Sequence, residues 1–208
     1  MRTALTPSQA HAAPTPTPPG ATAPGPLSPQ DIREVAEAQR RGRKVLKAAG
    51  VAAFNGWACA IVAALAVPFA LGSIPAALTA LALGAVARNE FRGRKMLLRF
   101  DPRGPRLLGW NQIGLLAVIV LYCLWHIYDG LTGPTLADQH PDLKLVLGSL
   151  ASLERNLTLG LYGSIIVVSA IAQGLTARYY FSRLTHLRGY LGQTPPWIVD
   201  LHRSVGPA

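Results

Sequence analysis

Apolar and charged residues are sharply separated along this chain of 208 residues. No Asp, Glu, Lys or Arg occurs in three stretches, residues 48–87, 107–128 and 156–177, which are 40, 22 and 22 residues long. Because about 20 apolar residues cross the hydrocarbon core of a bilayer, the second and third stretches each fit one helix. The first stretch is too long for one crossing and fits a pair. The pattern therefore predicts an all-α integral membrane protein whose fold is a four-helix transmembrane bundle made of two hairpins.

Turn signals and flanking charges define the expected helices. We predict membrane-spanning segments at about residues 49–71, 76–87, 108–128 and 157–177, which form a transmembrane domain over residues 49–177. A Gly-Ser-Ile-Pro sequence between the first two segments is typical of a tight turn. The second segment is short, so it either continues as a helix beyond Arg88 or forms a shallow hairpin with the first. Residues 129–156 are expected outside the membrane, with helical spacing of apolar residues from about Asp142.

The two ends of the chain differ from this central part. Residues 1–28 are rich in Pro, Ala and Thr and bury too little apolar surface to fold, so we predict a disordered tail. A juxtamembrane amphipathic helix is expected at residues 29–48, because Ser28 and Asp31 have the spacing of a capping box. Residues 178–208 form a basic C-terminal segment.

The distribution of charge predicts the orientation of the bundle. The net charge is +10, yet only 14% of the residues are charged and the mean hydropathy is +0.27. Four spans with both termini inside place 18 of the 20 Lys and Arg residues on the cytoplasmic side. We therefore expect a multi-pass protein of the plasma or inner membrane with cytoplasmic N- and C-termini. Nucleic acid is not an expected partner, because the basic residues flank apolar spans instead of covering a soluble face.

A basic hexapeptide occurs twice, as RGRKVL at Arg41–Leu46 and as RGRKML at Arg92–Leu97. At a cytoplasmic boundary each Arg or Lys contributes about 1 kcal/mol of attraction to anionic lipid. The candidate contacts to lipid headgroups are Arg41, Arg43, Lys44, Arg92, Arg94 and Lys95. A Gly-Trp pair follows each hexapeptide, at Gly56–Trp57 and Gly109–Trp110. The two halves of the chain are therefore either a duplication or two basic collars made alike by the positive-inside rule.

Four amide side chains occur inside the expected spans and form a candidate intramembrane polar cluster: Asn55, Asn111, Gln112 and Gln173. Each lies within roughly 6–12 Å of the cytoplasmic boundary, at a rise of about 1.5 Å per residue. Amides in lipid seek hydrogen-bond partners on neighbouring helices. Three interpretations stay open: the amides hold the bundle together, they line a polar vestibule for a small ligand or a lipid headgroup, or they simply face the membrane interface.

Few side chains in the expected spans suit catalysis or cofactor binding. His126 is the only histidine there, whereas a bis-histidine haem site needs two. Ser164 lies in a GLYGS sequence that lacks a clear nucleophile elbow. Cys59 and Cys123 lie about 16 Å and 24 Å from the basic ends of their helices, which argues against a disulfide. We therefore assign no catalytic residue and no cofactor, and we expect no enzymatic activity.

The outer loop contains the one arrangement that resembles a metal site. In its DQHPD sequence, Asp138, His140 and Asp142 alternate with other residues. Cation sites need a fixed geometry, which a loop containing Pro141 does not promise, so we assign no metal ligands.

Two classes of function remain at this point. The first is a non-enzymatic scaffold or interaction protein that contacts anionic lipid headgroups or partner membrane proteins through its basic collars and outer helix. The alternative is a homo-oligomeric channel or carrier for a small solute. The amide cluster discriminates between them, because amides that satisfy one another hold helices together, whereas amides that line an open cavity favour transport.

Overall fold

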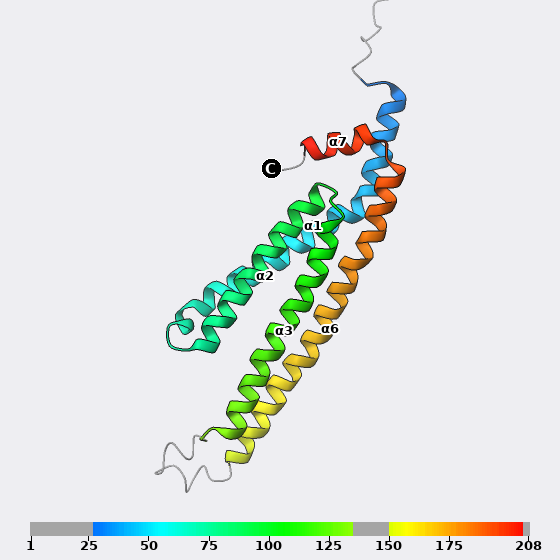
Figure 1. Ribbon diagram of the computed structural model, residues 1–208. Helices are drawn as coiled ribbons and strands as arrows, with labels where there is room; N and C mark the ends of the chain where they lie inside the picture. The colour runs from blue at the N-terminus through cyan, green and yellow to red at the C-terminus, as the bar shows by residue number, and fades with distance from the viewer. Residues whose placement is uncertain (1–26, 135–149, 206–208) are drawn as a thin grey trace, which may run out of the picture.

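A computed structural model describes residues 27–134 and 150–205 of the chain. In these residues the backbone forms five helices: α1 (Pro29–Ala70), α2 (Ile74–Leu98), α3 (Arg103–Thr132), α6 (Leu150–Gln193) and α7 (Pro196–Val205). α1 packs along α2 and α3 packs along α6, so the long helices form two hairpins, which Figure 1 shows side by side. The all-helical fold and the hairpin contacts confirm the coarser part of the sequence prediction, a helical bundle with hairpins. Most of the tail predicted to be disordered and most of the outer loop lie outside the described residues.

The predicted juxtamembrane helix and the first predicted span form one continuous helix, α1. Its N-terminus has the expected capping box. The Ser28 hydroxyl accepts a hydrogen bond from the Asp31 N–H at 3.2 Å, and the Asp31 carboxylate accepts one from the Ser28 N–H at 2.9 Å. These bonds favour the charged form and hold the pKa of Asp31 below its ordinary value. An i,i+4 ion pair also lies in this part of the helix, with 3.0 Å between Arg41 Nη2 and Glu37 Oε2.

The other three predicted spans each lie within a longer helix. The segment 76–87 belongs to α2, which continues past Arg88 to Leu98, as one of the two alternatives predicted. The segments 108–128 and 157–177 lie within α3 and α6. Three helices, α1, α3 and α6, are long and apolar enough to cross a membrane. α2 is not among them, because the second half of this helix is strongly charged.

The buried core lies mainly near the end of the bundle where α7 crosses (Figure 1). One large cluster contains the buried apolar residues Ala38, Val45, Ala48, Ala49, Ala52, Leu97, Phe100, Leu108, Tyr180, Leu187, Tyr190, Ile198 and Val199. A smaller cluster further along the bundle contains Cys59, Val86, Ala87 and Leu115. Beyond it the two hairpins separate, and their tips lie apart (Figure 1).

The outer surface of the long helices is apolar. Around the α1–α2 turn, Phe69, Leu71 and Ile74 are 72%, 89% and 78% exposed, although each is a large hydrophobic residue. Exposed apolar patches of this extent mark surfaces that contact lipid or another protein. Together with the three long apolar helices, they indicate a multi-pass membrane protein.

Candidate functional site

One buried polar cluster, here called the Glu90 cluster, receives a side chain from each of the four long helices. Glu90 of α2 lies at its centre and has no exposed surface. α3 contributes Asn111 and Gln112, which are 7% and 1% exposed. α6 contributes the buried Tyr180, and α1 contributes Asn55. The cluster therefore joins both hairpins at one level of the bundle.

Three neutral donors bond to the Glu90 carboxylate. Its Oε1 accepts hydrogen bonds from Asn111 Nδ2 at 2.8 Å and from Gln112 Nε2 at 2.7 Å. Its Oε2 accepts a longer bond from the Tyr180 hydroxyl at 3.4 Å. Both short bonds have the lengths typical of charge-assisted hydrogen bonds, which are roughly twice as strong as neutral ones.

A second set of bonds surrounds these donors. Asn55 Nδ2 donates to the Tyr180 hydroxyl at 3.4 Å, and Asn89 Nδ2 donates to Asn111 Oδ1 at 3.3 Å. Asn111 Nδ2 also donates to the Val86 carbonyl at 3.0 Å, so both of its N–H groups are used. The Asn111 side chain is thus fixed by three partners. These bonds link the five residues Asn55, Glu90, Asn111, Gln112 and Tyr180 into one network.

No cation partners the Glu90 carboxylate in the part of the chain that the structure describes. A buried carboxylate without a cation is costly unless hydrogen bonds compensate its lost hydration. The amide and phenol groups are such donors. Removing one of these donors leaves the buried charge with too few hydrogen bonds, which lowers the stability of the bundle.

Glycine and tryptophan bring the helices of each hairpin close together beside this cluster. A methyl group at Gly56 would lie 3.1 Å from the Phe91 ring, and one at Gly109 would lie 2.6 Å from the Phe181 ring. Trp57 packs edge-on against Phe91 and Trp110 against Phe181, with ring centroids 5.7 Å and 6.4 Å apart. Each Gly-Trp pair on an outgoing helix therefore faces a phenylalanine on the returning helix. The residues that precede these phenylalanines are Glu90 and Tyr180.

Three of the four predicted amides meet in the cluster and one does not. Asn111 and Gln112 bond to Glu90, and Asn55 reaches it through Tyr180. Gln173 is half-buried on α6 and makes no side-chain hydrogen bond to another described residue. It lies seven residues before Tyr180, which is about 10 Å along a helix.

Sequence reasoning missed Glu90 and Tyr180. Both follow an arginine, Arg88 or Arg178, that ends a charge-free stretch, so the predicted spans do not include them. One signal was available for Glu90, because it is the only acidic residue between Glu37 and Asp101.

Comparisons with known proteins add no family. No protein-family model, curated protein or solved structure matches this chain. Function has to be inferred from the residues themselves.

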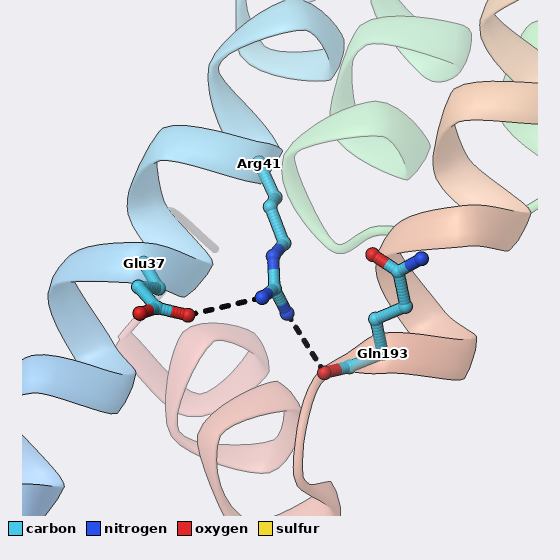
Figure 2. Close-up of polar contacts among 3 residues, drawn as sticks. All are labelled: Glu37, Arg41 and Gln193. Atoms are coloured by element: carbon cyan, nitrogen blue, oxygen red, sulfur yellow. Dashed lines mark hydrogen bonds and ion pairs between the residues drawn. The ribbon is translucent and has the colours of Figure 1, made fainter.

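The six candidate headgroup contacts are all exposed, but two of them have protein partners. Arg41 donates to the Gln193 carbonyl at 2.9 Å as well as to Glu37, so it ties α1 to the end of α6 (Figure 2). Lys44 Nζ lies 3.5 Å from His186 Nε2. Arg43, Arg92, Arg94 and Lys95 have no ion pair or side-chain hydrogen bond within the described residues.

The other residues considered from sequence have local partners. His126 stacks on Tyr162, with ring centroids 5.0 Å apart. The Ser164 hydroxyl donates to carbonyls of its own helix, those of Gly160 and Leu161. Cys59 and Cys123 are buried and free, and both line one cleft. The loop residues Asp138, His140 and Asp142 lie outside the described residues.

Proposed function

We propose that the chain is a four-span membrane protein of the plasma or inner membrane with both termini in the cytoplasm. We propose further that it is a non-enzymatic scaffold, which holds anionic lipid headgroups and partner membrane proteins at its basic end. Support for the orientation comes from the start of α1 and from α7, which lie at the same end of the bundle (Figure 1). The basic hexapeptides lie toward this end, where the positive-inside rule favours Lys and Arg.

The observation that carries the proposal is the alternation of buried and exposed residues in the two hexapeptides. Their glycines are buried: Gly42 faces the ring of Phe100, and Gly93 faces Leu108. Their basic residues are exposed, and four of the six have no partner among the described residues. The hexapeptide thus uses its small residue to pack the helix and directs its charges outward, which suits contact with anionic headgroups.

The Glu90 cluster supports a scaffold more than a transport path. Its central residues, Glu90, Asn111 and Gln112, are buried and bonded to one another. A polar group that coordinates a passing solute needs free hydrogen-bonding capacity, whereas these donors already have protein acceptors. The cluster therefore serves to fix the two hairpins against each other.

A carrier for an apolar solute is the second candidate, and one observation favours it. Two apolar clefts, of about 550 Å³ and 350 Å³, lie between the hairpins. They share Thr79, Val118 and Tyr122, so they adjoin. Such a volume is in the range of small-molecule sites.

Native mass spectrometry of the detergent-extracted protein tests the scaffold. The protein is incubated with a mixture of phosphatidylglycerol and phosphatidylcholine, beside a variant with Arg43, Arg92, Arg94 and Lys95 replaced by Gln. We expect the parent chain to retain phosphatidylglycerol preferentially and the variant to lose this preference. Equal retention of both lipids by the parent chain would contradict the proposal, and flux of an apolar dye in reconstituted vesicles would favour the carrier.

Cysteine labelling tests the four-span topology separately. Cys59 and Cys123 are first replaced by Ala, and single cysteines are introduced as His140→Cys, Arg43→Cys and Arg94→Cys. The last two positions are exposed, whereas Gly42 and Gly93 are buried and unsuitable. We expect a membrane-impermeant reagent to label position 140 in intact cells and the other two only after lysis. External labelling at position 94 would show that α2 does not cross.

A further inference from the structure

A second basic feature lies at the α2–α3 turn, apart from the hexapeptides. Two clefts of about 550 Å³ and 310 Å³ adjoin there and share Pro102 and Arg103. The larger is lined by Arg99, Asp101, Pro102, Arg103 and Arg203, and the smaller by Pro102, Arg103, Arg106, Leu184, Arg188 and Leu191. Five arginines from the turn, α3, α6 and α7 thus line two adjoining hollows, which we together call the arginine cleft.

Most of this charge is not compensated by protein groups. Arg99, Arg103, Arg106 and Arg188 have no ion pair within the described residues. Asp101, the one acidic residue that lines the cleft, uses its carboxylate to accept the Arg103 backbone N–H at 2.8 Å. Arg203 lies 3.6 Å from Asp200, which sits on its own helix and does not line the cleft. The cleft therefore has an excess of positive charge that an anionic ligand can neutralise.

The turn that carries Arg99 and Arg103 is held in a strained conformation. Phe100 has a φ of 53°, in the left-handed region that residues other than glycine rarely adopt. Its ring is buried and stacks on Tyr190 with centroids 4.4 Å apart. The Asp101 N–H donates to the Met96 carbonyl at 2.9 Å, which closes the end of α2. Residues held in such regions cluster at ligand sites, and here the strain directs Phe100 inward while its neighbours line the cleft.

The fifth arginine is supplied by α7, which is firmly docked. Ile198 is fully buried and Val199 is 6% exposed, both within the main core. The Tyr190 hydroxyl lies 2.7 Å from His202 Nδ1. Because Arg203 follows His202, this bond fixes the helix turn from which Arg203 faces the α2–α3 turn. The five arginine side chains are exposed, but the core positions the elements that carry them.

We propose that the arginine cleft binds a phosphate group of a membrane lipid or of a soluble phosphate compound. Guanidinium groups match phosphate oxygens with two parallel hydrogen bonds, so several arginines around one hollow suit a phosphomonoester or a diphosphate. Leu184 and Leu191 provide an apolar wall beside Arg188, where the non-phosphate part of the ligand contacts the protein. The site does not include Arg43, Arg92, Arg94 or Lys95, on which the proposed scaffold function rests. Either proposal can therefore fail without the other.

The test uses the full chain in a neutral detergent and two probes, short-chain phosphatidic acid and inorganic pyrophosphate. Binding of each is measured by isothermal titration calorimetry. The cleft variant combines Arg103→Gln with Arg203→Gln. The control combines Arg43→Gln with Arg94→Gln, which removes the same charge from exposed positions that line neither cleft. Circular dichroism and size-exclusion chromatography establish that both variants keep the parent helix content and size.

We expect the parent chain to bind at least one probe, the cleft variant to bind it roughly tenfold more weakly or worse, and the control to change affinity less than about twofold. Binding of phosphatidic acid alone identifies a lipid headgroup, and binding of pyrophosphate as well identifies a site open to soluble phosphates. Equal weakening in both variants would show diffuse attraction and overturn the proposal. Failure of the parent chain to bind either probe would overturn it as well. If the cleft variant misfolds, Arg103→Lys alone replaces it, with an expected loss of a few-fold because the paired hydrogen bonds are lost.

Discussion

The α1–α2 and α3–α6 hairpins are built with the same apolar contact but carry different polar groups. In each, a Gly-Trp pair on the outgoing helix packs against a phenylalanine on the returning helix. The residue before that phenylalanine points to the bundle centre, as Glu90 in the first hairpin and as Tyr180 in the second, and these two side chains bond to each other. Apolar packing therefore shapes each hairpin from within.

The polar bonds run between the hairpins. Every side-chain donor to Glu90 belongs to α3 or α6, and Asn55 and Asn89 of the first hairpin donate to residues of the second. The Glu90 carboxylate of the first hairpin thus accepts hydrogen bonds from three donors on the second hairpin. Two copies of the first hairpin would place carboxylates together, so the polar groups specify pairing with the unlike partner. The shared Gly-Trp contact agrees with a duplication of the two halves, which stays a hypothesis.

The largest expected effect on stability comes from replacing Asn111, the side chain that makes the most hydrogen bonds between the hairpins. Asn111→Leu deletes bonds to Glu90, to Asn89 and to the Val86 carbonyl. Because hydrogen bonds to a charged group contribute about 1.5–3 kcal/mol each, we expect the free energy of unfolding to fall by about 2–4 kcal/mol. The measurement is an SDS titration of the protein in mild detergent, followed by tryptophan fluorescence.

The Glu90→Gln background supplies the control for this prediction. Without the charge, the same Asn111→Leu change should cost about 1 kcal/mol less, because the bond to position 90 is then a neutral one. An equal cost in both backgrounds would show that Asn111 acts through packing and not through the carboxylate.

The next largest effect on stability distinguishes the close contact at Gly109 from the one at Gly56. Gly109→Ala places a methyl group 2.6 Å from the Phe181 ring, so we expect destabilisation by about 1–3 kcal/mol. Gly56→Ala meets the Phe91 ring at 3.1 Å, a tighter fit than usual but not an overlap. There the gain in helix propensity, about 1 kcal/mol, offsets the crowding. The same titration checks both, and an equal loss at the two positions would contradict the difference in fit.

A smaller effect on stability is expected from breaking the hydrogen bond between Tyr180 and Glu90. Tyr180→Phe removes only long bonds, at 3.4 Å to Glu90 and 3.4 Å from Asn55. We expect a loss of about 1 kcal/mol or less in the free energy of unfolding. A loss as large as that of Asn111→Leu would mean that the hydroxyl carries the contact between the hairpins.

The smallest effect concerns the start of the first hairpin. Since hydrogen bonds lower the pKa of Asp31, its stabilisation of α1 is complete above the ordinary carboxyl pKa and disappears as the pH falls through the lowered value. We expect acidification to lower the protection factors of the amides in the first turn of α1, each measured as the exchange rate relative to that of an unstructured chain at the same pH. Asp31→Asn should show these lower protection factors already at neutral pH and little further change, whereas unaltered protection of the first turn in acid would contradict a role for the carboxylate.

The sequence predicts the helices and three of the cluster residues because both depend on local pattern. Asn55, Asn111 and Gln112 stand out as amides inside charge-free stretches. Glu90 and Tyr180 do not, because charge defined the ends of the spans whereas the helices continue past Arg88 and Arg178. The convergence of arginines from α3, α6 and α7 depends on how Phe100 and α7 dock, which pattern alone does not reveal.

The charged second half of α2 has a consequence for the order in which the protein is made. Its charge-free part, residues 74–87, is about 21 Å long, less than the roughly 30 Å of a bilayer core. In the proposed four-span topology such a segment would insert poorly by itself, so α1 would enter the membrane first and pack against it. The donors for Glu90 lie on α3 and α6, which emerge from the ribosome later. In that topology the Glu90 carboxylate would stay hydrated until the second hairpin arrives with its donors.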